Sequence, residues 1–364
     1  MADERLTDAE DVHASVRRYY GETLSDSSDL QTSACATSAA PPPRLRALLA
    51  NLHDETMARY YGCGLIAPER LSGAHVLDLG CGAGRDVYVL SQLVSEDGRV
   101  VGVDMTDAQL EAAERHREWH RAKSGHARSN VRFLKGYLEK LDALGLENGS
   151  FDVAVSNCVL NLAADKPAVL RGVRRLLKPG GEFYFSDVYA DRPLSEAAAA
   201  DPVLYGECLG GALVWSEFVA LAQEAGFAAP RLVSAAPVTA LTEDVARAVG
   251  ETRFISATVR LFAAPADARA AAPASLTYQG GLDRLDDGPD DAFDFDLDTR
   301  FEQGAPKDVD AVTAALIAAS RFAPLFTVAP TSALPPTFAT RDAVAEAERA
   351  PAPEVGCGPS GCCG

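Results

Sequence analysis

The sequence predicts an α/β protein in which an N-terminal helical arm precedes a doubly wound sheet and a small C-terminal α+β domain follows it. Three observations support this prediction. A short apolar run at residues 76–79 leads directly into a glycine turn at residues 80–84. Further apolar runs alternate with helical patterns as far as residue 262, and the turn Leu177-Lys-Pro-Gly-Gly181 precedes one of them. Strands that alternate with helices in this way form parallel, doubly wound sheets.

The N-terminal arm, residues 1–71, is expected to hold two helices separated by a polar loop. Valine and tyrosine recur at helical spacing over residues 8–20, and the polar stretch that follows carries Cys35. Three consecutive prolines break the chain before a second predicted helix at about residues 44–60. Cys63 then lies at the junction with the sheet domain.

The sheet domain is expected to cover residues 72–262. The apolar runs predict its strands, and the patterns of spaced apolar residues between them predict its helices. The strands are predicted at residues 75–79, 99–103, 131–134, 151–156 and 181–187, and the main helices at 85–94, 107–122 and 167–177.

The C-terminal third begins with a low-complexity stretch of alanine and proline, residues 263–275, which predicts a linker. Residues 276–326 mix alternating apolar residues with an acidic run and a helical pattern near 307–320, so a small second domain is expected there. Residues 327–364 are rich in proline and alanine and are predicted to form a flexible tail. The tail ends in three cysteines, Cys357, Cys362 and Cys363.

Charge and composition restrict the partners of the chain. Its 364 residues have a formal charge of −18 at pH 7, so nucleic acids and anionic membranes would be repelled. No apolar run approaches the roughly 20 residues that span a bilayer, and the N-terminus is acidic without an apolar signal region. We therefore expect a cytoplasmic protein. Its eight scattered cysteines do not suit a secreted disulfide scaffold, and in a reducing compartment they act as fillers, soft-ion ligands or catalytic thiols.

The glycine turn and the acids around it favour S-adenosylmethionine over a dinucleotide. The third glycine of Gly80-x-Gly82-x-Gly84 comes one residue earlier than in the G-x-G-x-x-G fingerprint, which binds a pyrophosphate. Asp78 precedes the turn and suits the ammonium group of S-adenosylmethionine. Asp104 ends the second strand, 24 residues after Gly80, where a carboxylate accepts both ribose hydroxyls.

Residues after the second and third strands complete the predicted cofactor site. Met105 is placed to pack on the adenine face, and a backbone amide and a carboxylate of Lys135-Gly-Tyr-Leu-Glu139 are placed to read the adenine edge. A nicotinamide- or flavin-binding fold is the alternative. With the strand that begins Phe151-Asp152 and the Leu-Lys-Pro-Gly-Gly turn, the chain resembles the class I S-adenosylmethionine-dependent methyltransferases, which have a Rossmann-like sheet.

The contexts of four cysteines carry a narrower resemblance, to the arsenite methyltransferase family. The motifs are Val16-Arg-Arg-Tyr-Tyr-Gly-Glu-Thr-Leu with Asp29-Leu-Gln-Thr-Ser-Ala-Cys35, Tyr60-Tyr-Gly-Cys-Gly-Leu65, Ser156-Asn-Cys-Val-Leu-Asn-Leu162 and Tyr205-Gly-Glu-Cys-Leu-Gly-Gly-Ala-Leu213. The resemblance extends over about residues 12–326. It implies that methyl groups are transferred from S-adenosylmethionine to trivalent arsenic.

The resemblance also implies roles for individual residues. Cys158 and Cys208 hold the arsenic, with Cys63 as a further ligand, while Cys35 and Cys63 take part in the first methylation and in redox exchange. The expected cofactor-binding residues are Tyr61, Asp78, Gly80, Gly82, Gly84, Arg85, Asp104, Met105, Leu138, Glu139 and Asn157.

The chemistry of arsenic agrees with this set of thiols. Trivalent arsenic is thiophilic, and thiolates are the soft ligands among side chains. Thiolate-bound arsenic keeps a lone pair that attacks the sulfonium methyl, so no general base is required. The attack oxidises arsenic to the pentavalent state, and neighbouring thiols reduce it again by forming a disulfide. An external reductant, glutathione or thioredoxin, must then reopen that disulfide.

We therefore predict an arsenite methyltransferase whose substrate is arsenite or its glutathione complex, and whose products are mono-, di- and possibly trimethylated arsenicals formed in detoxification. A monomer is expected. Two rivals remain at this point. A class I methyltransferase for a small organic acceptor would have an apolar pocket and a dispensable Cys158. A non-catalytic arsenic-binding protein would bind arsenite without turnover of S-adenosylmethionine.

Overall fold

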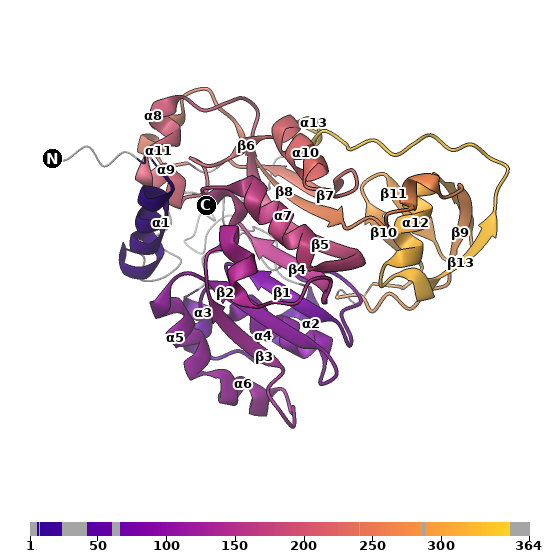
Figure 1. The fold of residues 1–364 in the computed structure, drawn as a ribbon, viewed down its shortest axis with the longest axis horizontal. Helices are drawn as coiled ribbons and strands as arrows, with labels where there is room; N and C mark the ends of the chain where they lie inside the picture. The colour runs from indigo at the N-terminus through magenta and orange to yellow at the C-terminus, as the bar shows by residue number, and fades with distance from the viewer. Residues whose placement is uncertain are drawn as a thin grey trace, which may run out of the picture.

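The central sheet of the computed structural model runs between an N-terminal arm and a C-terminal domain (Figure 1). The structure describes residues 6, 8–23, 42–59, 66–239, 241–285 and 288–349. The predicted site residues Cys35, Tyr61 and Cys63 lie outside these ranges, as do the tail cysteines Cys357, Cys362 and Cys363.

Strands of the central sheet follow the order β3-β2-β1-β4-β5-β8-β7, and the short strand β6 pairs with β5. Their bounds are β1 His75–Leu79, β2 Arg99–Asp104, β3 Val131–Lys135, β4 Phe151–Asn157, β5 Leu177–Ala190, β6 Leu213–Val214, β7 Arg231–Pro237 and β8 Phe254–Phe262. The strands from β3 to β5 run parallel, whereas β8 is antiparallel to both β5 and β7. The direction of winding therefore reverses between β1 and β4, which is where such folds bind their ligands.

Helices cover both faces of the sheet, because its central strands are buried on both sides. The helices along this part of the chain are α4 Arg85–Val94, α5 Asp107–Arg115, α6 Arg117–Lys123, α7 Lys166–Leu176 and α10 Trp215–Glu224. Short 3₁₀ segments follow β3 and β4, at Leu138–Leu144 and Leu160–Leu162. Two large apolar clusters, one including Val169 and Phe185 and the other including Val87 and Val100, fill the space between the sheet and these helices.

The first part of the N-terminal arm lies beside the small helices that follow β5, whereas its second part packs against α4 and α5 (Figure 1). Its elements are α1 Ala9–Arg18, a π-helical turn Tyr19–Thr23, α2 Pro43–Leu49 and α3 Asp54–Ala58. The small helices are α8 Glu196–Ala199, α9 Pro202–Gly206 and α11 Glu243–Val249. A third apolar cluster joins the two groups and contains Val12 and Val16 from the arm as well as Cys158 and Cys208.

The C-terminal domain packs against the opposite, β7–β8 end of the molecule (Figure 1). It contains the sheet β12-β9-β13 and the hairpin β10-β11, together with one α-helix and two 3₁₀ turns. Its bounds are Ala268–Ala270 (3₁₀), β9 Ala274–Tyr278, β10 Ala292–Asp296, β11 Thr299–Glu302, β12 Pro306–Val309, α12 Ala311–Ala319, Ala323–Leu325 (3₁₀) and β13 Phe326–Pro330. Buried Arg231 on β7 is anchored to Asp296 of this domain at 2.9 Å and lies 3.5 Å from the ring centroid of Phe338.

Two predicted helices are interrupted. In place of one helix at about 44–60, the chain forms α2 and α3, and the imidazole of His53 caps the start of α3. The predicted helix 107–122 is divided into α5 and α6 because His116 leaves helical geometry, with φ −101° and ψ 7°. Its imidazole there lies 2.7 Å from the Glu55 carboxylate, so the break joins α3 to the sheet domain.

The stretch after residue 326 differs from the expected flexible tail as far as residue 349. β13 pairs with β9, and the helix α13 (Ala343–Ala347) packs against β7 and β8. The composition suggested a flexible tail because the side chains that anchor this stretch to the rest of the protein are small or few. Ala343 is fully buried in the core beneath α10, and the Trp215 indole donates to the Arg341 carbonyl at 3.1 Å.

None of the helices in the described ranges combines the length and the apolar character that crossing a bilayer requires.

Candidate active site

An open cavity of about 1000 Å³ lies at the carboxyl ends of β1, β2, β3 and β4. Most of the predicted cofactor residues line it, although they come from separate strands and loops. These are Asp78, Gly80, Gly82, Arg85, Asp104, Met105, Leu138, Glu139 and Asn157, and Cys158 is in the same wall. The cavity therefore lies at the switch point of the sheet, where folds of this kind bind their ligands.

The glycine turn forms the floor of this cavity. Gly80 and Gly82 both have positive φ, 72° and 50°. A Cβ on Gly80 would lie 2.5 Å from the Val159 side chain, whereas a Cβ on Gly82 would meet no atom within 4 Å. Gly82 thus presents bare backbone to the cavity. Gly84 differs from the expectation, because it caps α4 and its Cα packs toward Phe133 rather than lining the cavity.

Asp104 is fixed in the cavity wall by two backbone amides. Its Oδ2 accepts from the Gly82 N–H at 2.9 Å and its Oδ1 from the Thr106 N–H at 2.8 Å. Burial raises the pKa of this carboxyl above its usual value. These amides hold the carboxylate rigidly at the wall of the cavity.

Two further acids line the cavity. The Oδ2 of Asp78 is buried without a hydrogen-bond partner, whereas the Oδ1 of Asp86, which also has none, lies 3.7 Å from Arg85 Nη1. Burial raises the pKa of Asp78 well above its usual value, with a further contribution from the neighbouring Asp86 and Asp104. A buried carboxylate oxygen without a donor is unfavourable unless a ligand supplies one. The ammonium and sulfonium charges of S-adenosylmethionine fit this set of residues.

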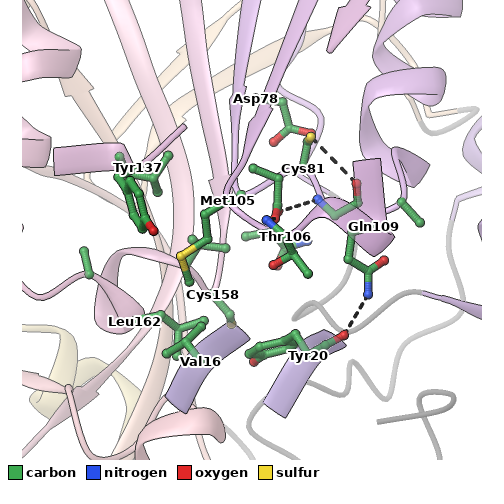
Figure 2. A pocket seen from close by; sticks show the side chains of 18 of the residues that line it. Val16, Tyr20, Asp78, Cys81, Met105, Thr106, Gln109, Tyr137, Cys158 and Leu162 are labelled. Atoms are coloured by element: carbon green, nitrogen blue, oxygen red, sulfur yellow. Dashed lines mark hydrogen bonds between the residues drawn. The ribbon is translucent and has the colours of Figure 1, made fainter. Parts of the chain in front are cut away.

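The end of β4 and the segment after β3 close the remaining sides. Asn157 donates from Nδ2 to Asp86 at 3.0 Å, so it orients an acid of the cavity. The Glu139 carboxylate, expected to read an adenine edge, accepts from the Ala164 N–H at 2.9 Å and lies 3.0 Å from His13 Nε2. Met105 packs against the apolar cluster around Cys158, toward which its side chain points in Figure 2.

The N-terminal arm supplies a wall that the sequence did not reveal. His13, Val16 and Tyr20 line the cavity, and the Tyr20 carbonyl accepts from Gln109 Nε2 at 3.0 Å (Figure 2). No local sequence pattern predicts this placement, because the spacing of apolar residues in the arm indicates an amphipathic helix but not the surface against which it packs. Thr106 and Gln109, which also line the cavity, follow β2 and lie within two turns of Asp104 along the chain.

Cys158 stands where β4 ends, at the border of the cavity and the apolar cluster beneath the arm. It is 2% exposed and adopts a left-handed conformation, φ 55°, that is uncommon for a residue with a side chain. Its N–H donates to the Ser186 carbonyl on β5 at 2.9 Å. Cys158 is disulfide-bonded, whereas Cys81 and Cys208 carry thiols.

Cys208 lies directly behind Cys158, although 50 residues separate them. Its Sγ donates to the Cys158 carbonyl oxygen at 2.8 Å, and the residue is fully buried. It is also left-handed, with φ 62°. Asn161 Nδ2 donates to the Cys208 carbonyl at 3.2 Å and so holds the turn from behind. The two cysteines predicted to act together are therefore brought together, but only Cys158 lines the cavity itself.

Ionisable groups surround this pair of cysteines. Burial raises the pKa of Asp187 to about 7, although the Val188 and Asn161 amides donate to it. Burial lowers the pKa of Lys166 to about 8, opposed by the nearby charge of Asp187. The cysteine pair thus sits beside an acid and a base whose charges change near neutral pH.

Comparison with known protein families gives two matches along the chain. Residues 71–226 match a family described as a methyltransferase domain, and residues 271–364 match one described as the arsenite methyltransferase C-terminal domain.

Curated relatives and a solved structure agree with these matches. The chain is 46% identical to the arsenite methyltransferase of Homo sapiens, over 91% of this chain and 87% of the relative. It is 49% identical to that of Aquipseudomonas alcaligenes, over 86% and 90% of the two chains. A crystal structure of an arsenic(III) S-adenosylmethionine methyltransferase from Chlamydomonas reinhardtii superposes with a TM-score of 0.75 at 43% identity, covering 81% of this chain and 98% of that one.

Proposed function

The chain belongs to the arsenite methyltransferase family and methylates trivalent arsenic with S-adenosylmethionine, and from this premise we propose how its residues divide the work. Cys158 and Cys208 bind the arsenic, and the cavity beside Cys158 binds the cofactor. The observation that carries the proposal is the contact between the Cys208 sulfur and the Cys158 backbone at the cavity wall.

The cofactor residues act by charge and by shape. Asp78 receives the ammonium group, because one of its oxygens is buried without a donor. Asp104, held by the Gly82 and Thr106 amides, accepts the ribose hydroxyls. When bound, S-adenosylmethionine supplies a methyl group activated by a sulfonium sulfur. Gly80, Gly82, Arg85, Met105, Leu138, Glu139 and Asn157 shape the cavity around it, and Tyr61 and Gly84 remain predictions without such a contact.

The cysteines act as ligands and as reductants. Two thiolates fix trivalent arsenic while leaving its lone pair directed at the methyl group, so orientation replaces a general base. Methyl transfer removes two electrons from arsenic, and two thiols return them by forming a disulfide. Cys35 and Cys63, which the structure does not describe, are proposed to serve the first methylation, with Cys63 as the third sulfur.

An external thiol must open the disulfide before another turnover. Cys158 is itself disulfide-bonded in the structure, and a sulfur in a disulfide does not bind arsenic. We therefore propose glutathione or thioredoxin as reductant, and arsenite or its glutathione complex as substrate. A reducing compartment, the cytoplasm, suits these thiols. Successive methylation to mono-, di- and trimethylated products in arsenic detoxification, by a monomer, completes the proposal.

One assay tests the methylation of arsenite and the role of the external reductant, and the substitutions in the Discussion test the individual residues. The full chain is incubated with isotopically labelled S-adenosylmethionine, arsenite and glutathione, and the arsenic species are separated. Labelled methylated arsenicals should accumulate over many turnovers with glutathione and stop after about one turnover without it. Unchanged multiple turnover without any thiol would overturn the role of the external reductant.

A further inference from the structure

Residues of the N-terminal arm contact the turn that carries Cys208, and the proposed function assigns no role to these contacts. The Tyr19 hydroxyl donates to Glu207 Oε1 at 2.5 Å, across 188 residues of chain. Glu207 directly precedes Cys208 and is fully buried, and Tyr19 is 8% exposed. A buried carboxyl that receives a hydrogen bond from so far along the chain fixes the position of the turn.

Two further contacts join the same partners. The Tyr20 hydroxyl donates to the Gly206 carbonyl at 2.7 Å. The Tyr19 ring packs on Gly206 so closely that a Cβ there would lie 2.7 Å from the ring. The π-helical turn of the arm therefore contacts Gly206 and Glu207, the two residues immediately before Cys208. π-Helical turns are rare and frequently occur at functional sites.

Cys208 needs such support because its backbone is strained. Its φ of 62° lies in the left-handed region, which is unfavourable for a side chain larger than that of glycine. Surrounding contacts must stabilise that conformation, and within the described ranges these include Asn161 on one side and the arm on the other.

The same turn of the arm also contacts the cofactor cavity. Tyr20 lines the cavity, and its carbonyl accepts from Gln109 at 3.0 Å. The next residue, Gly21, lies against the Thr106 side chain, to which an added Cβ would be 3.3 Å away. Adjacent residues of one short turn thus contact the cofactor site and the Cys208 turn.

We infer that Tyr19, acting through Glu207, is a positioning residue for Cys208, and that it couples arsenic binding to occupation of the cofactor cavity. The inference rests on the proposed role of Cys208 as an arsenic ligand. A ligand in the cavity stabilises the arm, the arm stabilises the left-handed turn, and the thiol is thereby held at the arsenic site. By linkage, arsenic must strengthen cofactor binding by the same factor.

The test uses the reduced full chain, with methylarsenite as arsenic probe and S-adenosylhomocysteine as a ligand that cannot react. Dissociation constants for methylarsenite are measured by equilibrium dialysis with and without S-adenosylhomocysteine. In the parent chain S-adenosylhomocysteine should tighten methylarsenite binding. Tyr19→Phe, which removes one hydroxyl, should weaken methylarsenite binding roughly tenfold and abolish the tightening, while the affinity for S-adenosylhomocysteine alone stays within about twofold.

Matched variants separate positioning from general loss of stability. Glu207→Gln keeps an oxygen that accepts from Tyr19 and should retain binding, whereas Glu207→Ala should behave as Tyr19→Phe does. The double variant Tyr19→Phe/Glu207→Ala should bind methylarsenite no more weakly than either single variant does. Tyr278→Phe removes a comparable hydrogen bond, to Asp290 in the C-terminal domain, and should leave methylarsenite binding unchanged.

Two outcomes would overturn the inference: parent-like methylarsenite binding and coupling in both Tyr19→Phe and Glu207→Ala, or an absence of coupling in the parent chain. Cys208→Ser, measured in parallel, keeps the failures distinct. Unchanged methylarsenite binding in Cys208→Ser would contradict the proposed function itself, whereas loss in Cys208→Ser with none in Tyr19→Phe would contradict only the positioning role.

Discussion

Two halves of the site both contain backbone with positive φ, but different residue types occupy these positions. The cofactor half contains the glycine turn, and the cysteine half contains Cys158 and Cys208. Both lie at the carboxyl edge of one sheet, and both need chain reversals with positive φ. The cofactor half places Gly80 and Gly82 at these positions, where the absence of a side chain removes the strain. The cysteine half places Cys158 and Cys208 at φ 55° and 62°, where the proposed arsenic site requires a side chain.

This difference shows what each half is selected to present. Bare backbone and fixed carboxylates are proposed to bind the cofactor, and their geometry is stabilised by nearby residues, as for Asp104 with its two amides. Soft sulfur is proposed to bind the substrate, and the turn that carries Cys208 is contacted by residues far along the chain, as for Tyr19 with Glu207. Strained residues persist only where surrounding structure stabilises them. We therefore expect the two halves to respond differently to substitution.

The largest effect should follow replacement of a cysteine of the pair. Cys158→Ser and Cys208→Ser exchange a soft thiolate for a hard hydroxyl. Loss of an outer-shell partner of a bound ion already costs roughly 10–100-fold. Loss of a direct ligand should therefore lower the methylation of arsenite and of methylarsenite by more than that. Both variants should bind S-adenosylmethionine like the parent chain, as measured by calorimetry. Substantial methylation of either substrate by one of them would refute the arsenic site.

A step-specific loss is expected for Cys35→Ser and Cys63→Ser. Arsenite can engage three sulfur ligands, whereas methylarsenite has one valence occupied by carbon and needs two. These variants should lose the first methylation and retain the second, when methylarsenite is supplied directly and products are separated by chromatography. If both steps disappeared, these residues would belong to the central site or to the fold, and the division between pairs would be wrong.

In the cofactor half, Asp104→Ala should weaken S-adenosylmethionine binding at least tenfold. Two ribose hydroxyls would lose a charged acceptor, and hydrogen bonds to charged groups contribute about 1.5–3 kcal/mol each. Titration calorimetry measures the change, and the methylarsenite dissociation constant in the absence of cofactor serves as the control. An unaltered cofactor affinity would remove Asp104 from the ribose site.

The cysteine half should also give the protein a pH dependence. The pKa of Asp187 is raised to about 7 by burial, so its contribution to stability is complete below its ordinary value of about 4 and is lost as the pH rises through about 7. Relative to Asp187→Asn, the parent chain should lose about 2 kcal/mol between pH 5 and pH 7. Urea unfolding at several pH values measures this difference, and parallel curves for the two proteins would contradict it.

The smallest predicted effect tests the backbone comparison itself. At a left-handed position glycine is less strained than alanine, so Cys208→Gly should be more stable than Cys208→Ala by about 1 kcal/mol. In the cofactor half the same exchange, Gly82→Ala, should lower stability by a similar amount, since a Cβ there meets no atom and only strain contributes. Thermal unfolding without ligands compares them, and a more stable Cys208→Ala would argue against strain at Cys208.

Much of the cofactor half was predictable, because its signals are short in sequence. The strand-turn-helix pattern around Gly80 and the acid at Asp104 fix a geometry within about 25 residues, and the strand bounds confirm it. The cysteine contexts also identified the family. Wrong expectations arose where side chains acted over longer distances, as at His116, which divides a predicted helix, and at Ala343, which anchors an expected flexible tail.

By itself the sequence determined the fold class, the family and the cofactor, because each depends on residue types at fixed short spacings. Only the tertiary structure decided that Cys208 lies behind Cys158, that Gly84 packs a helix rather than lining the cavity, and that the arm covers both sites. These facts depend on contacts such as the one from Tyr19 to Glu207. The free energy of such contacts belongs to the packed state, and no local pattern encodes the partner of a residue 188 positions away.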